Sequence, residues 1–340
     1  MSKNFKTLRQ AFFYAKKKIS KKKWNWMSCG SEREYTTNAN LNYFKKFKIK
    51  QKILQDVSKI KTEKLFLGKK IKFPMLIAPM GYMAQFHKHG EKGLALGAFK
   101  SNTFMCLSAV SSFKINEITK KEKQLNLIYQ FYSLKPRSWV KDELRRISKM
   151  GVKAICITTD SPVRSIKYDI IEDEHDARKY GWIGLPRPPL QHMSKLTWSD
   201  ISWLKRQTKI PIIIKGVMNV EDAKKSFKHG ANIIWVSNHG GRTLESGLSS
   251  LEALNKIRKK FKKKLIIFDG GVRTGTDMFK ALCLGADYVC IGRPAIWGLI
   301  LNGSDGVSQI LNLFYQEFRS IMGLSGCNDI KKISENYLIK

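Results

Sequence analysis

Apolar and polar positions alternate in a regular pattern from Pro74 onwards. Short apolar runs, rich in β-branched residues and too short for helices, are separated by longer amphipathic stretches. Each apolar run predicts a strand, and the eight runs are 74–80, 103–109, 125–132, 152–160, 210–215, 232–238, 265–270 and 287–292.

The amphipathic stretches between these runs predict helices, most clearly at 91–101, 137–150, 220–229, 250–262 and 274–284. Strands that are apolar along nearly their whole length, alternating with helices, are typical of a parallel sheet covered on both faces. Eight such units predict an α/β fold of the closed TIM (β/α)₈ barrel type rather than an open sheet.

Two segments depart from this rhythm. Residues 1–73 are rich in lysine and irregular, with a helix predicted before Trp24. We predict a single domain in which 1–73 form a helical extension packed on the barrel, and 74–340 form the barrel with its C-terminal helices. The insert after Asp160 contains residues 180–193. A long loop in this place lies on the catalytic face of a barrel and often acts as a lid.

The net charge of +36 changes the range of partners to consider. One interpretation is a nucleic-acid or anionic-membrane partner. The other is a genome whose base composition favours lysine codons, and we prefer it because the lysines are spread over the whole chain. No RNA-binding motif supports a nucleic-acid partner. Peripheral contact with an anionic membrane, at the inner face of the cell membrane, stays open.

Cysteine usage points to a reducing compartment. The six cysteines are scattered and form no C-x-x-C pair, so we expect inert core residues. No run approaches the ~20 apolar residues of a membrane span, and no secretory signal is apparent. We expect a cytoplasmic protein without a bound metal.

Polar side chains follow the predicted strands at their C-terminal ends, where barrel enzymes carry their active sites. These residues are Ser108, Gln130, Tyr132, Thr158, Asp160, Lys215, Ser237, His239, Asp269 and Arg293. Core filling does not explain so many polar groups in this position.

The sharpest local signal is SNHGGR at 237–242, directly after an apolar strand. Paired glycines let the backbone approach a ligand closely. His239 can accept and return a proton near neutral pH, and Arg242 can hold a carboxylate through two hydrogen bonds.

Glycine-rich turns follow the last two strands, in FDGGVRTGTD (268–277) and CIGRPAIWG (290–298). Such turns, leading into helix N-termini, cradle phosphate through backbone N–H groups, and Arg273 and Arg293 add positive charge. A phosphate site after strands seven and eight is common in barrels. Lys215 ends another apolar strand, where a cation could stabilise negative charge that develops on a bound group.

At this point the chain resembles a known family, the FMN-dependent α-hydroxy acid dehydrogenases and oxidases, which includes glycolate oxidase, lactate oxidase and mandelate dehydrogenase. The resemblance covers nearly the whole chain. It is carried by IAPMG (77–81), LS (107–108), YQFY (129–132), TTDSP (158–162), KGV (215–217), SNHGGR, DGGVR (269–273), GADYVCIGRP (285–294) and LSGC (324–327).

The resemblance implies a role for each matching position. His239 would be the catalytic base oriented by Asp160, while Arg242 and Tyr132 would hold the substrate. The implied contacts to FMN are Pro79, Met80 and Gly81 beneath the flavin, Ser108, Gln130, Thr158, Lys215 and Ser237 around it, and Asp269, Gly271, Arg273, Gly292 and Arg293 at its phosphate end. The implied reaction is oxidation of an L-2-hydroxy acid to a 2-keto acid by hydride transfer to the flavin.

Two positions depart from the family pattern. Trp26 stands where the family usually has a substrate-binding tyrosine. Lys167 stands, in ungapped register, where the family has a second substrate arginine, and Arg164 is nearby. Because an indole is larger than a phenol, and because Trp182, Ile183 and Leu185 are apolar, we expect a substrate with an apolar or aromatic side chain rather than glycolate.

Several alternatives stay open at this point. The chain could be a flavin-binding barrel whose substrate activity is altered or lost, or a basic flavin barrel that acts on RNA. The electron acceptor could be a quinone, a cytochrome or O₂, and the chain could form a homo-oligomer. Gly81 stands where several family oxidases carry alanine, so we expect a dehydrogenase rather than a fast oxidase.

Overall fold

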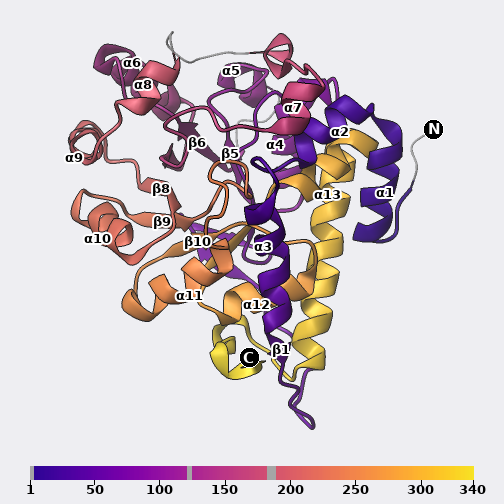
Figure 1. Ribbon diagram of the computed structural model, residues 1–340. Helices are drawn as coiled ribbons and strands as arrows, with labels where there is room; N and C mark the ends of the chain where they lie inside the picture. Colours follow the sequence, from indigo (N-terminus) through magenta and orange to yellow (C-terminus); the bar gives the residue numbers. More distant parts are fainter. Residues whose placement is uncertain (1–3, 121–124, 182–188) are drawn as a thin grey trace.

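The computed structural model describes residues 4–120, 125–181 and 189–340. Its centre is a closed parallel barrel in which each strand pairs with the next one along the chain (Figure 1). The strands are β4 (Met75–Ile77), β5 (Met105–Leu107), β6 (Leu127–Phe131), β7 (Ala154–Thr158), β8 (Ile212–Val217), β9 (Ile233–Val236), β10 (Ile266–Phe268) and β11 (Tyr288–Ile291). Pairing of Cys290 with Leu76 closes the ring between β11 and β4. The prediction of a TIM barrel is therefore confirmed.

The barrel is filled from inside and closed at its N-terminal end. Interior positions carry apolar side chains, among them Trp235, which is fully buried. A hairpin of β2 (Lys64–Phe66) and β3 (Lys69–Ile71) brings the ring of Phe66 to 4.3 Å from Tyr288 and 5.0 Å from Phe104. Since this end is plugged by aromatic rings, the C-terminal ends of the strands are left to form a site.

Helices surround the barrel. They are α4 (Gly90–Lys100), α5 (Ile115–Thr119), α6 (Arg137–Lys149), α9 (Trp198–Gln207), α10 (Val220–Lys228), α11 (Ser250–Lys260), α12 (Gly275–Cys283) and α13 (Arg293–Leu324). The last of these is kinked at Asn302 and Gly303, whose dihedral angles are not helical. The five helices predicted most clearly from the sequence correspond to α4, α6, α10, α11 and α12. Helix α9 was not separated from the long insert in the sequence analysis.

The N-terminal segment is more regular than the sequence suggested. It forms α1 (Leu8–Lys18), α2 (Lys21–Ser28), α3 (Tyr35–Tyr43) and the short η1 (Phe44–Lys46). Helix α1 is the helix predicted before Trp24, and Trp24 itself lies inside a second helix, α2. Helix α1 packs beside α13 (Figure 1). Strand β1 (Lys48–Ile49) pairs with β12 (Leu338–Ile339), preceded by η4 (Ile330–Lys332) and η5 (Glu335–Tyr337), so the two ends of the chain are tied together. The boundary at residue 73 stays a prediction.

The insert after β7 is partly helical. It contains α7 (Tyr168–Glu172), η3 (Ala177–Tyr180) and α8 (Pro189–Ser194). Asn25 and Lys22 of α2 donate to the side chain and the backbone of Asp173, at 2.9 and 2.8 Å, and hold the start of the insert against α2. Trp182, Ile183 and Leu185, expected on the catalytic face, lie outside the described residues.

Two further expectations can be compared with the structure. All six cysteines are free and buried, as expected of core residues. Among the helices of the described ranges, none combines the length and apolar character required to cross a membrane.

Candidate active site

A cavity of about 1210 Å³ opens at the C-terminal ends of the barrel strands. Side chains from almost every βα loop line it, together with Trp26 and Met27 of α2 and residues 161–178 of the insert. Predicted site residues in its lining are Trp26, Pro79, Met80, Gly81, Tyr132, Lys167, Lys215, His239, Arg242, Asp269, Gly271, Arg273, Gly292 and Arg293. Thus the fold brings together residues from both ends of the sequence.

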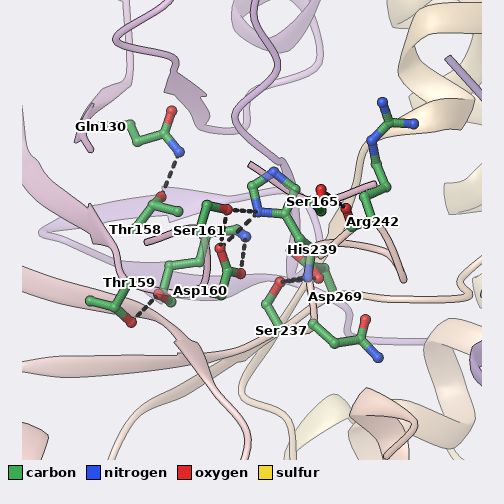
Figure 2. A network of polar contacts seen from close by, with 12 residues as sticks. Gln130, Thr158, Thr159, Asp160, Ser161, Ser165, Ser237, His239, Arg242 and Asp269 are labelled. Atoms are coloured by element: carbon green, nitrogen blue, oxygen red, sulfur yellow. Dashed lines mark hydrogen bonds and ion pairs between the residues drawn. The ribbon is translucent and has the colours of Figure 1, made fainter. Parts of the chain in front are cut away.

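His239 and Asp160 form a hydrogen-bonded pair at the centre of the site (Figure 2). Nδ1 of His239 lies 2.8 Å from Oδ1 of Asp160, and the hydroxyl of Ser161 lies 3.0 Å from the same oxygen. On the other side of the carboxylate, Nζ of Lys215 lies 3.5 Å from Oδ2. Gly216 permits this arrangement because a Cβ there would come within 2.7 Å of the Asp160 side chain.

Opposite charges keep this centre ionised. Burial alone would raise the pKa of Asp160, but the charge of Lys215, followed by the interaction with His239, outweighs it and holds the pKa well below its usual range. Burial alone would lower the pKa of Lys215, yet Asp160 and then Asp269 raise it above its ordinary value. Carboxylate and ammonium therefore stabilise each other, and an anionic partner stands beside the imidazole.

Asp269 lies nearer to this centre than the sequence suggested. The hydroxyl of Ser237 donates to its Oδ1 at 2.6 Å, and its charge acts on Lys215. Burial raises the pKa of Asp269. Asp269 thus differs from the other residues predicted for the phosphate end, which lie among the arginines.

Arg242 points away from His239 and toward the end of helix α2 (Figure 2). Its guanidinium donates to the backbone carbonyls of Trp26, Met27 and Cys29 at 2.9, 3.1 and 2.7 Å, and lies 5.5 Å from the centre of the Trp26 ring. These bonds use three of the five N–H donors of an arginine. Nε and one hydrogen of Nη2 have no such bond within the described part of the chain, so an edge stays available for an anion.

Arg273 and Arg293 form a cationic end of the cavity. Burial lowers the pKa of Arg273 to about 10, and burial together with Arg273 and Arg242 lowers the pKa of Arg293 to about 9. Neither guanidinium forms an ion pair with a carboxylate of the described residues. Two desolvated cations without an anion are costly, so this end favours binding of an anionic group.

Backbone groups at the same end complete the anion site. Gly271 has a φ of +80°, which favours glycine, and lines the cavity. Helix α13 begins at Arg293 with Gly292 as its N-cap, and no side chain caps it. Pro294 has no N–H, and the N–H groups of Ala295 and Ile296 donate to the carbonyl of Gly292, so the N–H of Arg293 and the positive dipole of the helix are what this N-terminus offers a phosphate.

The remaining predicted cofactor contacts are buried at the strand ends but are not part of the cavity lining. They are Ser108, Gln130, Thr158 and Ser237. Nε2 of Gln130 donates to the Thr158 hydroxyl at 2.5 Å, while Oε1 of Gln130 is buried and has no partner among the described residues. An unsatisfied buried amide oxygen is rare in native proteins. It fits a bound group that supplies a donor.

Lys167 and Tyr132 lie on the substrate side of the cavity. Burial, followed by the charge of Arg242, lowers the pKa of Lys167 to about 8, and its ammonium donates to the Ser165 hydroxyl. Burial raises the pKa of Tyr132 to about 12, so its hydroxyl is a protonated donor. Lys167 lies near Arg242, and Tyr132 lies near Lys215 and Asp160, so the cavity lining offers several donors that suit a carboxylate.

Sequence reasoning missed three groups that shape the site. Ser161 follows Asp160 directly and was quoted only inside a motif. Asn40 of α3 exchanges hydrogen bonds of 2.8 and 2.9 Å with Asn238 and had no signal, because α3 lacks an apolar stripe. Tyr82, which lines the cavity next to Gly81, could have been found only by its position after that motif.

Comparisons with known proteins identify the family. The chain matches the FMN-dependent dehydrogenase family over residues 15–182 and 186–340. It is 34% identical to 2-hydroxyacid oxidase 2 of Mus musculus over 336 residues, which is 95% of both chains. It is also 34% identical to glycolate oxidase of Spinacia oleracea over 343 residues, 95% of this chain and 93% of that one.

Solved structures agree with this result. A soluble mutant of the membrane-associated (S)-mandelate dehydrogenase from Pseudomonas putida superimposes with a TM-score of 0.92 at 27% identity, over 99% of each chain. The chain belongs to the family of FMN-dependent dehydrogenases. The predictions of the family, of an oxidoreductase of the 2-hydroxy acid oxidising class and of FMN as its cofactor are thereby confirmed.

The described residues fit this cofactor. The paired arginines, the N-terminus of α13 and Gly271 form an anion site at one end of the cavity. Lys215 of β8 also lines the cavity, and Oε1 of Gln130, in β6, is buried without a partner among the described residues. A phosphate at the anion site and a polar ring system that reaches Gln130 would satisfy both.

Proposed function

We propose that this chain oxidises an L-2-hydroxy acid to a 2-keto acid with bound FMN, using His239 as the base. The observation that supports this most directly is the 2.8 Å bond between His239 and an Asp160 held ionised, inside a cavity whose cations suit a carboxylate. FMN supplies the hydride acceptor when it is bound.

The pair fixes the role of each imidazole nitrogen. Because Nδ1 faces the carboxylate of Asp160, Nδ1 carries the hydrogen and Nε2 is left as the acceptor. Nε2 removes the hydroxyl proton of the substrate, and Asp160 stabilises the imidazolium that forms. Ser161 keeps the carboxylate oriented through its 3.0 Å bond.

The carboxylate of the substrate is held by Arg242, Tyr132 and Lys167, which all line the cavity. Arg242 binds it through the edge that its backbone bonds leave available. The phosphate of FMN is held by Arg273, Arg293 and the glycines at 271 and 292. The flavin ring is held by Pro79, Met80, Gly81, Ser108, Gln130, Thr158, Lys215, Ser237 and Asp269.

The test is anaerobic mixing of the FMN-loaded protein with a panel of 2-hydroxy acids. We expect a yellow protein with one FMN per chain, whose flavin absorbance bleaches with at least one L-acid and not with its D-enantiomer. A protein that binds FMN but is bleached by none of them would support the alternative of a barrel that has lost its substrate.

We propose a dehydrogenase rather than a fast oxidase, based on Gly81, and we leave a quinone, a cytochrome and O₂ as acceptors to be compared. The reduced protein should react more slowly with air than with a quinone or a dye. Equal rates would reverse this assignment. Sedimentation of the loaded protein will show whether it forms a homo-oligomer.

We also propose a cytoplasmic protein that contacts an anionic membrane surface. Exposed Val163, Ile166 and Ile171 line the mouth of the cavity, and Ser31 bonds the backbones of both Ile166 and Thr243, which places exposed Leu244 beside them. The net charge of +36 favours an anionic surface. Cosedimentation with phosphatidylglycerol vesicles, but not phosphatidylcholine vesicles, tests this, and Leu244→Ser should weaken it. A protein that stays in the supernatant with both vesicle types would refute it.

A further inference from the structure

Tyr82 is a cavity residue for which the proposed function has no role. It follows Gly81 in the loop between β4 and α4, and it has a φ of 59°, which is uncommon for a residue other than glycine. Its N–H donates to the carbonyl of Val110 at 3.1 Å. The next N–H, of Met83, donates to the buried carboxylate of Glu91 at 3.0 Å.

These bonds fix the direction of the Tyr82 side chain. A left-handed backbone conformation outside glycine costs energy and persists only where the surroundings enforce it. Glu91 also accepts the N–H of Ser112 at 3.0 Å, so one carboxylate joins the loop after β4 to the loop after β5. The backbone on both sides of Tyr82 is therefore held, and its ring is directed into the lining of the cavity.

Tyr82 contacts the aromatic residue that covers Arg242. Its ring meets Trp26 edge to face, with centroids 6.2 Å apart and an interplanar angle of 81°. The guanidinium carbon of Arg242 lies 5.5 Å from the centroid of the same indole. Trp26 thus spans the distance between Arg242 and Tyr82, and all three side chains border one part of the cavity.

The phenol group of Tyr82 is buried in the lining of the cavity, near Tyr132 and near Arg178 and Asp176 of the insert. Burial, followed by Tyr132, raises the pKa of Tyr82 above its usual range, so the hydroxyl is protonated at all physiological pH values. Tyr132 follows β6 and lies near Lys215 and Asp160. A protonated phenol in the cavity lining can donate a hydrogen bond.

We propose that Tyr82 is a substrate-binding residue, whose hydroxyl donates a hydrogen bond to the carboxylate of the 2-hydroxy acid together with Arg242 and Tyr132. The proposal rests on the proposed function and adds a residue to its binding site. Trp26 has no hydroxyl for this role, because its indole carries a single N–H donor and no oxygen. The Trp26 ring instead packs edge to face against the Tyr82 ring.

A contact to the carboxylate has a distinctive consequence. Every 2-hydroxy acid carries a carboxylate, so loss of the Tyr82 hydroxyl weakens the binding of all substrates by the same factor. A contact to the side chain of the substrate would instead affect large and small acids differently. The two arrangements are separated by comparing L-lactate with L-mandelate.

The experiment uses FMN-loaded Tyr82→Phe, with Tyr168→Phe as a matched control on the rim, outside the cavity lining. Anaerobic stopped-flow mixing gives the dissociation constant and the limiting rate of flavin bleaching for each acid. For Tyr82→Phe we expect both dissociation constants to rise by about tenfold or more, since hydrogen bonds to charged groups are worth ~1.5–3 kcal/mol. The limiting rates should change much less, and the control should match the wild type.

Two results would overturn the proposal. Unchanged dissociation constants for both acids would show that Tyr82 only packs against Trp26. A rise for one acid alone would place the hydroxyl at the side-chain end of the substrate. If neither acid bleaches the wild type, the proposed function fails, and the perturbation of flavin absorbance by L-lactate and L-mandelate still measures binding. In that case the dissociation constants obtained from this perturbation must rise by the same factor for both acids in Tyr82→Phe.

Discussion

The ammonium group of Lys215 lies 3.5 Å from Oδ2 of Asp160, whose other oxygen bonds to His239. One carboxylate therefore joins the cation predicted to contact the flavin to the base that acts on the substrate. Both members of the ion pair are almost fully buried, and each keeps the other charged. Removal of either charge should affect the other in a measurable way.

Replacement of Lys215 by methionine should destabilise the reduced flavin more than the oxidised flavin. Negative charge on the ring exists only after reduction, so the cation acts selectively on that state. We expect the two-electron reduction potential to fall by about 30 mV or more, which is a tenfold shift in equilibrium for this number of electrons. Spectroelectrochemistry checks it, with the exposed Lys224→Met as control. An unchanged reduction potential would show that Lys215 does not stabilise the reduced flavin.

Loss of His239 should stop flavin bleaching by substrate while FMN stays bound. Proton transfer by a positioned group contributes ~10²–10⁴-fold to the rate, and no other imidazole lines this part of the cavity among the described residues, apart from His175 of the insert. Because His239 has a φ of 58°, His239→Asn is preferable to alanine, since asparagine tolerates this conformation.

The control for His239 is His229→Ala, whose imidazole bonds to Ser202 on the outer helices. Rapid-reaction bleaching of the flavin measures the rate, and absorbance of the purified protein measures its FMN content. A His239→Asn protein that keeps more than about a hundredth of the wild-type rate would show that another group takes the proton.

Substrate affinity should depend on pH through Lys167, whose pKa is lowered to about 8 by burial and by Arg242. A bound carboxylate favours the protonated ammonium, so the complex takes up a proton above this pH. Affinity is therefore full below pH 8 and falls as the pH rises through 8 and beyond. Lys167→Arg should remove this dependence, because a guanidinium stays charged. Dissociation constants between pH 6 and 10, measured for wild type and variant, test the idea, and two parallel profiles would contradict it.

Trp26→Tyr should shift preference toward smaller acids. The indole contacts Arg242, Tyr82 and Phe86, and its centroid lies 5.8 Å from that of Phe86. It therefore fills the part of the cavity next to Arg242, which we propose binds the substrate carboxylate. A phenol is smaller and leaves room there. The comparison is kcat/KM for glycolate, lactate, 2-hydroxyisocaproate, mandelate and phenyllactate. If glycolate is already the best substrate and the substitution changes nothing, the volume argument is wrong.

The strands could be predicted because a barrel strand is buried on both faces and so appears as an uninterrupted apolar run. The run at 210–215, for example, became β8 (Ile212–Val217). Helix α3 could not be predicted in the same way. Its buried face carries Thr36, Thr37 and Asn40, which form hydrogen bonds with the loop at 237–248 instead of packing in a hydrophobic core. A polar helix of this kind has no apolar periodicity.

The candidate site was predictable as a set of residues but not as an arrangement. Polar groups at strand ends meet at one face of a barrel wherever their side chains point. The hydrogen-bond partners of Arg242 are backbone carbonyls at the end of α2. Every residue type has a backbone carbonyl, so these partners cannot be recognised from the sequence. Nor does the sequence show that Asp269 bonds to Ser237.

The carbonyls of Met27 and Cys29 each accept from both Arg242 and Arg293, residues up to 266 positions later in the chain. On the ribosome the second donor to each carbonyl is therefore missing until Arg293 emerges, which takes on the order of tens of seconds at ~5–20 residues per second. Until then Arg242 is the only one of the two arginines that can bond to the end of α2. A nascent or proteolytically shortened chain that ends before Arg293 holds the proposed ring contacts but lacks one of the two arginines of the phosphate end, so the FMN site becomes complete only after most of the chain has been made.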